Sequence, residues 1–284
     1  MTPFSERLAD AVRRAGHCLC VGLDPRWESL PLAVRVAHPT PAAAYEAFGL
    51  RVLELIAPLV RVVKPQAAFF EQAGPDGMRA MQVILRRARA MGFVTILDAK
   101  RGDIASTADA YADAAFGPVW DADALTVNPY LGADAVAPFI ARARAAQRGV
   151  FVLVRTSNPG GIFQNLNCDG RPLYRRVAEA VAEWNAANVG ANGLGDVGAV
   201  AGATHPAELA ELRAAMPNVW LLVPGYGAQG GTAADVRAGL RADGLGAVVN
   251  SSRGVTFPFQ PDDPNWEAKI VAATTHAAEE LRLH

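Results

Sequence analysis

Short runs of apolar, often β-branched residues recur along the chain, and most of them end in a polar residue or a glycine. The segments between them carry helical patterns, such as 41–56, 76–91 and 206–216. We expect strands at eight runs: 18–24, 60–64, 93–98, 123–128, 149–155, 197–202, 218–224 and 245–250. Strands that alternate with helices indicate right-handed βαβ crossovers and a parallel sheet.

Eight such units favour a closed barrel over an open sheet. A single (β/α)8 barrel needs about 250 residues, so a chain of 284 permits one domain over residues 1–284. No Gly-x-Gly-x-x-Gly turn follows the first run, as a dinucleotide-binding sheet would require. We therefore predict an α/β fold, a (β/α)8 TIM barrel with an N-terminal helix and an insert after the fifth strand. This insert, roughly 158–195, contains a Gly/Asn-rich loop and an amphipathic helix around 173–189, and we assign it no role.

Composition excludes several classes of partner. Hydrophobic residues make up 51% of the chain and charged residues 19%, and the formal net charge is -1, which provides no basic field for nucleic acid. No run approaches the roughly 18 apolar residues of a membrane span, so we expect no membrane partner. The first 16 residues mix charged and apolar positions as an amphipathic helix does, unlike a signal peptide. We therefore expect a cytoplasmic protein.

The cysteines and histidines indicate packing rather than chemistry. Cys18 and Cys20 lie on the first apolar run, and a metal site there would need two more ligands at suitable spacing. The five histidines are scattered without a motif. Cys168 lies in a polar stretch with no neighbouring base. We predict no metal site and no cofactor.

The segment 98–104 carries the most informative chemistry in the chain. It places Asp98, Lys100 and Asp103 where an apolar run ends, and Lys64 ends an earlier run. Residues two apart on a strand share a face, so we expect Asp98 and Lys100 to point the same way. Alternating lysines and aspartates in one cavity are costly unless they neutralise one another, and such arrays are typical of functional sites. The alternative is a pair of solvated ion pairs at a strand-to-helix turn.

Other predicted strand ends favour the functional interpretation, because barrel enzymes hold their catalytic groups there. The loops after the last two strands contain Gly230, Gly231 and Arg253, a combination suited to phosphate. Thr232 and Asp235 form a capping-box pattern directly after the glycines. A plain turn would explain the glycines alone, but Arg253 at the next strand end favours a phosphate site. The polar residues at the strand ends are Asp24, Lys64, Asp98, Lys100, Asn128, Arg155, Thr156, Ser157, Gln229, Asn250, Ser251, Ser252 and Arg253.

These motifs, in this order, resemble the orotidine 5′-phosphate decarboxylase family in its longer bacterial branch. The resemblance covers nearly the whole chain and is carried by 21–24, 63–65, 97–104, the loop 224–231 and 252–253. It implies decarboxylation of orotidine 5′-phosphate to uridine 5′-phosphate (UMP) in pyrimidine biosynthesis, without a cofactor or metal. It also implies a homodimer with shared active sites.

The resemblance further implies roles for individual residues. Lys64, Asp98, Lys100 and Asp103 correspond to a catalytic tetrad, in which Lys100 stabilises a carbanion at C6 and protonates it. The implied substrate-binding residues are Asp24 for a ribose hydroxyl, Ser157 for the pyrimidine edge, Gln229, Gly230, Gly231 and Arg253 for the 5′-phosphate, and Ile104 and Thr107, which with Asp103 reach the partner's site.

Three alternatives remain open on the sequence. A metal-dependent sugar-phosphate decarboxylase related to 3-keto-gulonate 6-phosphate decarboxylase has a similar D-x-K-x-x-D, but is expected to carry an acid in place of Lys64. A Schiff-base aldolase would need a neutral lysine, and a lysine between two acids stays protonated. A non-catalytic phosphate-binding barrel is the third.

Overall fold

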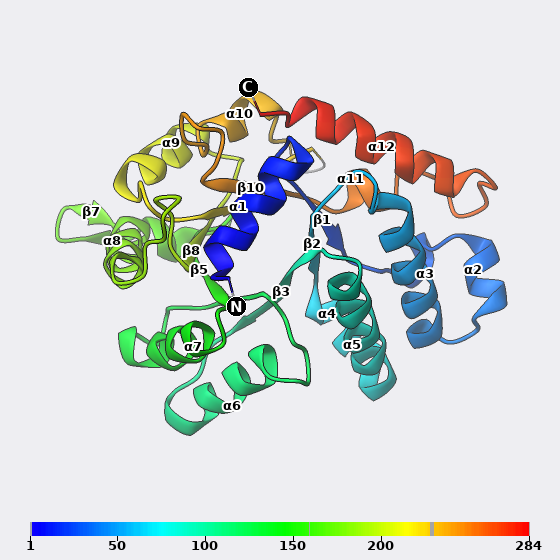
Figure 1. The fold of residues 1–284 in the computed structure, drawn as a ribbon, viewed down its shortest axis with the longest axis horizontal. Coiled ribbons are helices and arrows are strands. Elements are labelled where there is room, and N and C mark those ends of the chain that lie inside the picture. Colours follow the sequence, from blue (N-terminus) through cyan, green and yellow to red (C-terminus); the bar gives the residue numbers. More distant parts are fainter. Residues whose placement is uncertain (1, 159, 228–229, 284) are drawn as a thin grey trace.

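The computed structural model describes residues 2–158, 160–227 and 230–283, and its strands form a closed parallel barrel (Figure 1). Around the barrel the order is β1-β10-β9-β8-β5-β4-β3-β2. Each of the eight runs expected to be a strand overlaps one strand of the barrel, and three strands extend one to three residues beyond the expected end. This confirms the (β/α)8 TIM barrel. The strands are β1 (Leu19–Leu23), β2 (Val62–Pro65), β3 (Val94–Arg101), β4 (Ala124–Val127), β5 (Gly149–Arg155), β8 (Val197–Ala201), β9 (Leu221–Val223) and β10 (Ala247–Ser251).

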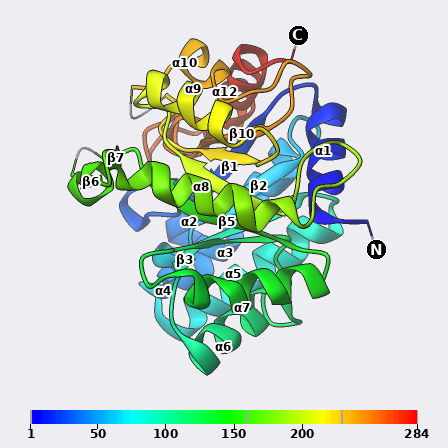
Figure 2. The same cartoon turned by 90° about the vertical axis from the view of Figure 1, so that its left-hand side faces the viewer.

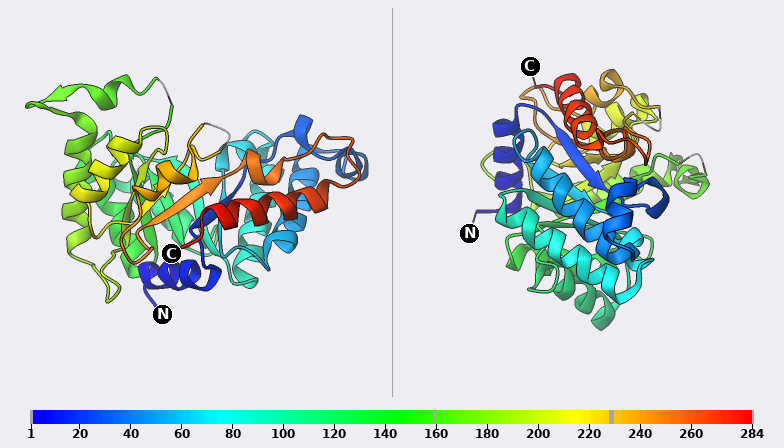
Figure 3. Two further views of the ribbon diagram at one scale, coloured as in Figure 1. Left: turned by 90° about the horizontal axis from the view of Figure 1, so that it is seen from above. Right: turned by 90° about the vertical axis from the view of Figure 1, so that its right-hand side faces the viewer.

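Helices surround the barrel (Figures 1 and 3). The expected helix at 41–56 has those bounds, and those at 76–91 and 206–216 differ by one or two residues at their ends. The longer outer helices are α3 (Pro41–Ile56), α5 (Gly74–Ala90), α6 (Ala105–Phe116), α7 (Ala133–Ala145), α8 (Leu173–Ala186), α9 (Pro206–Ala215) and α12 (Trp266–Glu280). Short helical turns are η1 (Trp27–Ser29), α2 (Leu32–Ala37), α4 (Ala67–Glu71), η2 (Ile162–Asn165), α10 (Ala233–Arg237) and α11 (Arg253–Thr256).

The N-terminal helix α1 (Phe4–Ala15) covers the amino-terminal end of the barrel. Its apolar face is buried in one cluster with residues that fill the barrel interior. Phe4 packs edge-on against Phe151, with ring centroids 6.0 Å apart. Gly149 permits this contact, because a Cβ there would lie 2.2 Å from the Phe4 ring. The helix therefore closes this end of the barrel, and a site built from strand ends must lie at the opposite end.

The segment after β5 differs in part from the predicted insert. Its helix, α8, packs on β5 and β8 and is the ordinary outer helix of the fifth βα unit. The additional structure is confined to residues before α8. It consists of η2 and a two-stranded antiparallel ribbon, β6 (Asn167–Cys168) and β7 (Arg171–Pro172), which projects from the barrel (Figures 2 and 3). The sequence located the insert correctly but assigned it a helix that belongs to the barrel.

Two of the three cysteines are core residues. Cys18 and Cys20 are buried in the barrel wall, and burial raises the pKa of both thiols to about 12. Cys168 is exposed on β6. In the part of the chain that the structure describes, no helix is long and apolar enough to cross a membrane.

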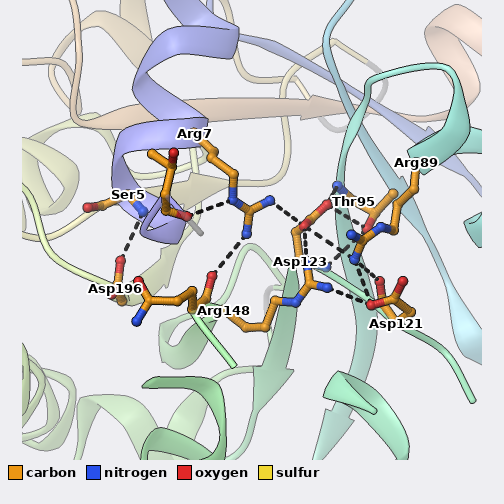
Figure 4. A network of polar contacts seen from close by, with 10 residues as sticks. Ser5, Arg7, Arg89, Thr95, Asp121, Asp123, Arg148 and Asp196 are labelled. Carbon is orange, nitrogen blue, oxygen red and sulfur yellow. Dashed lines mark hydrogen bonds and ion pairs between the residues drawn. The ribbon is translucent and has the colours of Figure 1, made fainter. Parts of the chain in front are cut away.

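A polar network ties α1 to the amino-terminal ends of three strands (Figure 4). Its centre is the buried carboxylate of Asp123, which directly precedes β4. One oxygen accepts hydrogen bonds from Arg7 and Arg148, and the other accepts from the N–H and hydroxyl of Thr95 at 2.9 and 3.1 Å. Arg148 also pairs with Asp121 at 2.5 Å. This carboxylate joins α1 to β3, β4 and the residue before β5.

We expect Asp123→Asn to destabilise the barrel by about 3–5 kcal/mol, because the substitution removes the buried negative charge that pairs with the buried Arg148 and the half-buried Arg7. Urea-induced unfolding of the variant and the wild type measures the difference. The matched control is Asp10→Asn, since Asp10 forms an exposed pair with Arg14 on α1 and its loss should cost less than about 1 kcal/mol. Equal effects of the two substitutions would contradict a central role for Asp123.

Candidate active site

The carboxyl ends of the strands surround a cavity of about 460 Å³. Polar side chains from β1, β2, β3 and β10 or their adjoining loops line it together with the apolar residues Leu153, Val200 and Leu222. Of the residues singled out from the sequence as site residues, the structure places six around this cavity: Asp24, Lys64, Asp98, Lys100, Ser157 and Arg253.

The carboxylate of Asp98 is the centre of the cavity's charge cluster. Its Oδ2 accepts a hydrogen bond from Lys64 Nζ at 2.6 Å, and its Oδ1 accepts one from Lys100 Nζ at 2.6 Å. Gln66 Nε2 and Thr126 Oγ1 donate to the same two oxygens at 3.0 Å each. The Lys64 side chain is 5% exposed and that of Lys100 is 45% exposed. Lys64 is therefore fixed in the wall, whereas Lys100 presents its ammonium to the cavity.

The ion pairs outweigh the cost of burial. Burial by itself would raise the pKa of Asp98, but Lys64 and Lys100 hold it well below its usual range. Burial would likewise lower the pKa of Lys64, but Asp98 and then Asp24 raise it above its ordinary value. Asp98 is thus ionised and Lys64 protonated throughout the neutral pH range.

The backbone at Lys100 departs from a regular strand. Its φ is +48°, and the β3–β4 register shifts between Leu97 and Arg101. The hydroxyl of Thr126, on β4, accepts the backbone N–H groups of Ala99 and Lys100 at 3.1 and 2.9 Å. The expectation that Asp98 and Lys100 point the same way is confirmed by their ion pair. The strand end that carries them is irregular rather than a regular continuation of β3, and Thr126 holds it in this form.

Two further acceptors face the cavity without partners in the described part of the chain. They are Asp24 Oδ1, after β1, and Asn250 Oδ1, on β10, and both atoms are buried. Buried acceptors are normally satisfied, so these two atoms are suited to hydroxyl or N–H groups of a ligand. The close approach of β1 and β10 depends on Gly22, since a Cβ there would lie 1.9 Å from Ser252 Oγ.

Ser157 lies on the opposite wall of the cavity, in the loop after β5. Its position depends on Gly202, which directly follows β8: a Cβ at Gly202 would lie 2.9 Å from the Ser157 backbone. The neighbouring Thr156 is held by Gln164 of η2, whose side chain accepts the Thr156 N–H at 2.9 Å. The additional structure after β5 thus supports this wall.

The predicted phosphate loops are brought together only in part. Arg253 lines the cavity, whereas Gly230 and Gly231 do not. The N–H of Gly230 donates to Gly227 O at 2.8 Å and that of Gly231 to Gly225 O at 3.0 Å, so both are used within the loop. The capping box of Thr232 and Asp235 is confirmed and begins the short helix α10. Gln229 lies outside the described residues.

Three predicted residues lie away from this chain's cavity, in the β3–α6 segment. Asp103 Oδ1 accepts the N–H of Ile104 at 2.8 Å, and neither residue lines the cavity. Ile104 is 55% exposed, and Thr107 is exposed on the first turn of α6. The cavity of this chain therefore holds three members of the implied tetrad.

Sequence reasoning missed Gln66 and Thr126, and assigned no role to Asn250. One signal was available for the lysines. The chain has 27 lysines and arginines, of which only Lys64, Lys100 and Lys269 are lysines, and two of these three meet in the cavity. A compact ammonium that can release a proton is not interchangeable with a guanidinium. No comparable signal distinguishes Thr126 from other strand threonines.

Among the residues that the structure describes, no three His, Cys, Asp or Glu side chains are grouped so as to hold a metal ion. The fold and the site define the class of the protein, a (β/α)8 barrel with a lysine–aspartate cavity where enzymes of this fold hold their catalytic groups. The family model described as "Orotidine 5'-phosphate decarboxylase / HUMPS family" matches residues 17–265. The chain belongs to this family.

Relatives match over nearly their whole length. An orotidine 5′-phosphate decarboxylase of Rhodopirellula baltica is 48% identical over 99% of this chain and 100% of its own. One of Roseiflexus sp. is 45% identical over 89% of each chain. The solved structure of Leishmania donovani OMP decarboxylase is 39% identical, with a TM-score of 0.80 over 99% of this chain and 97% of that chain.

We expect Asp98→Asn to lower the pKa of Lys64, because the attraction is removed while the burial remains. In the wild type the Lys64 ammonium should lose its proton only above the ordinary lysine range, whereas in the variant it should do so at a lower pH. An NMR titration of labelled lysine side chains measures this directly, and three lysines give few signals to assign. Lys269, paired with Asp263 on the surface, is the internal control. An unchanged Lys64 titration would mean that Asp98 does not set its charge.

Proposed function

We propose that this chain decarboxylates orotidine 5′-phosphate to UMP in pyrimidine biosynthesis, and that Lys64, Asp98 and Lys100 carry the chemistry. The observation that carries the mechanism is the sharing of one buried carboxylate by two lysines, one fixed and one open to the cavity. Membership of the family supports the reaction, and the ion pairs of Asp98 with Lys64 and Lys100 support the roles of these three residues.

Loss of CO₂ from C6 of the orotate ring leaves a carbanion that the ring delocalises poorly. An ammonium placed before the reaction stabilises that charge without the cost of reorganising solvent. Lys100 fits this role because Asp98 orients its ammonium at 2.6 Å while 45% of the side chain is exposed. It then donates its proton to C6 and regains one from solvent. Lys64 orients Asp98 from the other side.

The remaining polar groups of the cavity fit the nucleotide. Asp24 and Asn250 supply buried acceptors for ribose hydroxyl or ring N–H groups, and Ser157 contacts the pyrimidine edge. Arg253 binds the 5′-phosphate. Gln229, Gly230 and Gly231 also bind the 5′-phosphate. The N–H groups of the two glycines then leave Gly227 O and Gly225 O and donate to phosphate oxygens instead. Binding energy from the phosphate is then used to close the site around the ring.

We further propose a homodimer in which Asp103, Ile104 and Thr107 complete the partner's site. Asp103 belongs to the implied tetrad yet lies away from its own cavity. The β3–α6 segment that carries Asp103 and the β4–α7 segment both expose large side chains, including Ile104 at 55%, Leu131 at 50% and Tyr130 at 83% exposure. Such apolar exposure is typical of an interaction surface.

The proposal includes one domain over residues 1–284, a cytoplasmic location, and catalysis without metal or cofactor. The enediolate alternative is disfavoured because Lys64 occupies a position where Mg²⁺ chemistry needs a carboxylate. The aldolase alternative is disfavoured because both lysines are ion-paired with Asp98, and an ion-paired ammonium is a poor nucleophile.

We expect the purified chain to convert orotidine 5′-phosphate to UMP at a rate that exhaustive chelation leaves unchanged. The change in ultraviolet absorbance of the pyrimidine measures the reaction, and Lys100→Ala is the inactive control. Activity that is lost with EDTA and restored with Mg²⁺ would favour the enediolate alternative. No activity with either treatment would favour a non-catalytic barrel.

Arg253→Ala should weaken transition-state binding of orotidine 5′-phosphate by about 3 kcal/mol, the value of two charge-assisted hydrogen bonds at roughly 1.5 kcal/mol each. It should scarcely affect orotidine, which lacks the phosphate. The comparison of kcat/KM on the two substrates measures this difference. Arg237→Ala, an exposed arginine on α10 outside the cavity, is the matched control. Equal losses on both substrates would make Arg253 a structural residue.

Asp103→Ala and Lys100→Ala chains, each nearly inactive alone, should regain activity when mixed and allowed to exchange subunits. Random exchange makes about half the dimers mixed, each with one intact site, so recovery should approach roughly a quarter of wild-type activity. The control is a mixture of Asp98→Ala and Lys100→Ala, which should not recover, because those two residues lie in the same chain's cavity. Failure of the first mixture, with exchange confirmed by mass spectrometry, would place Asp103 in its own subunit's site.

A further inference from the structure

We infer a second anion site at the amino-terminal end of the barrel, which takes a small dianion of the phosphate or phosphomonoester type. A cavity of about 270 Å³ lies there, at the end of the barrel opposite the catalytic cavity. Its polar lining comes from α1, from the residue before β2, from the last turn of α5 and from the residue before β4. These side chains are Arg7, Asp10, Arg14, Arg61, Arg89 and Asp123.

The charges around this cavity do not balance. Asp123 is paired with Arg7 and Arg148, Asp121 with Arg89 and Arg148, and Asp10 with Arg14 (Figure 4 shows the first two). Five arginines thus face three aspartates in the described part of the chain, which leaves two positive charges uncompensated. The five are Arg7, Arg14, Arg61, Arg89 and Arg148. A dianion matches this excess.

Arg61 takes no part in the ion pairs of Asp121 and Asp123 that hold α1 to the barrel. It makes no ion pair with any described residue, and its hydrogen bonds to Ala57 O and Val60 O both use Nη1. Arg89, across the cavity, likewise donates through Nη1 alone, to Asp121. Each guanidinium therefore retains donors, and a guanidinium binds phosphate oxygens with two parallel hydrogen bonds. Arg7 and Arg148 are accounted for by holding α1 to the barrel, but Arg61 is not.

The cavity is suited to a compact ligand. The side chains of Arg7 and Arg89 are each 29% exposed, so the arginines are partly desolvated yet reachable from solvent. The rest of the lining comes from Ala11, Gly92, Phe93 and Val94, whose side chains offer no acceptor that competes for the arginines. A bound dianion would join α1 to α5 and to the segment before β2, and would stabilise the closed end of the barrel. The inference is independent of the proposed reaction.

Titration calorimetry with inorganic phosphate tests the site on the full chain, at an ionic strength held constant with sodium chloride. An Arg253→Ala background reduces binding at the catalytic end. We expect a remaining phosphate site that Arg61→Gln weakens by roughly tenfold or more, the value of one lost charge-assisted contact. Arg87→Gln, an exposed arginine on α5 outside the cavity, is the matched control and should not change the affinity.

Two variants keep the test decisive if Arg61→Gln fails to fold. Arg14 is largely exposed, so Arg14→Gln should fold, and it should weaken phosphate because Asp10 is then left unpaired beside the anion. Asp10→Asn removes a carboxylate from the cavity and should tighten the binding of phosphate, which general structural damage would not do.

Glycerol 3-phosphate is the second probe. Tighter binding than that of phosphate identifies a phosphorylated metabolite as the ligand, and weaker binding identifies free phosphate.

The inference is overturned if phosphate binds no better than chloride at equal ionic strength. It is also overturned if Arg61→Gln, Arg14→Gln and Asp10→Asn all bind phosphate as Arg87→Gln does. Thermal unfolding with and without phosphate provides a parallel readout, since a ligand that binds only the folded state raises the melting temperature.

Discussion

The shared carboxylate of Asp98 is the interaction on which the catalytic end of this barrel depends. A buried aspartate is tolerated only when donors surround it, and Asp98 has four, from Lys64, Lys100, Gln66 and Thr126. The ion pairs keep Asp98 ionised and Lys64 protonated, and the difference in exposure separates the roles of the two lysines. One holds the carboxylate, and the other faces the cavity.

This arrangement needs both a rigid frame and a local irregularity. The frame comes from the parallel barrel, whose far end is closed by α1 with Phe4 packed on Phe151. The irregularity is the left-handed backbone of Lys100, which the Thr126 hydroxyl holds from the next strand. The Thr126 hydroxyl accepts the backbone N–H groups of Ala99 and Lys100, so β4 fixes the backbone from which the Lys100 side chain reaches Asp98.

The buried carboxylates at the two ends of the barrel are paired with different cations for physical reasons. Asp98 is paired with lysines, whose compact ammonium concentrates charge and can transfer a proton. Asp123 is paired with arginines, whose planar forks bridge several acceptors at once, as Arg148 does between Asp121 and Asp123. An arginine stays charged throughout the neutral pH range, so it suits a structural or anion-binding role but not proton transfer.

The sequence by itself determined the barrel, the positions of its strands and the family. The apolar runs, their alternation with helical patterns and the residues of each motif can all be identified from short stretches of the chain. It also placed Asp24, Lys64, Asp98, Lys100, Ser157 and Arg253 at strand ends, and closure of the barrel necessarily brings strand ends together. Only the tertiary structure decided that Thr126 shapes the Lys100 backbone, that α8 belongs to the barrel, and that Asp103 lies away from its own cavity. These features depend on register between strands and on packing between segments distant in the chain, which no local pattern encodes.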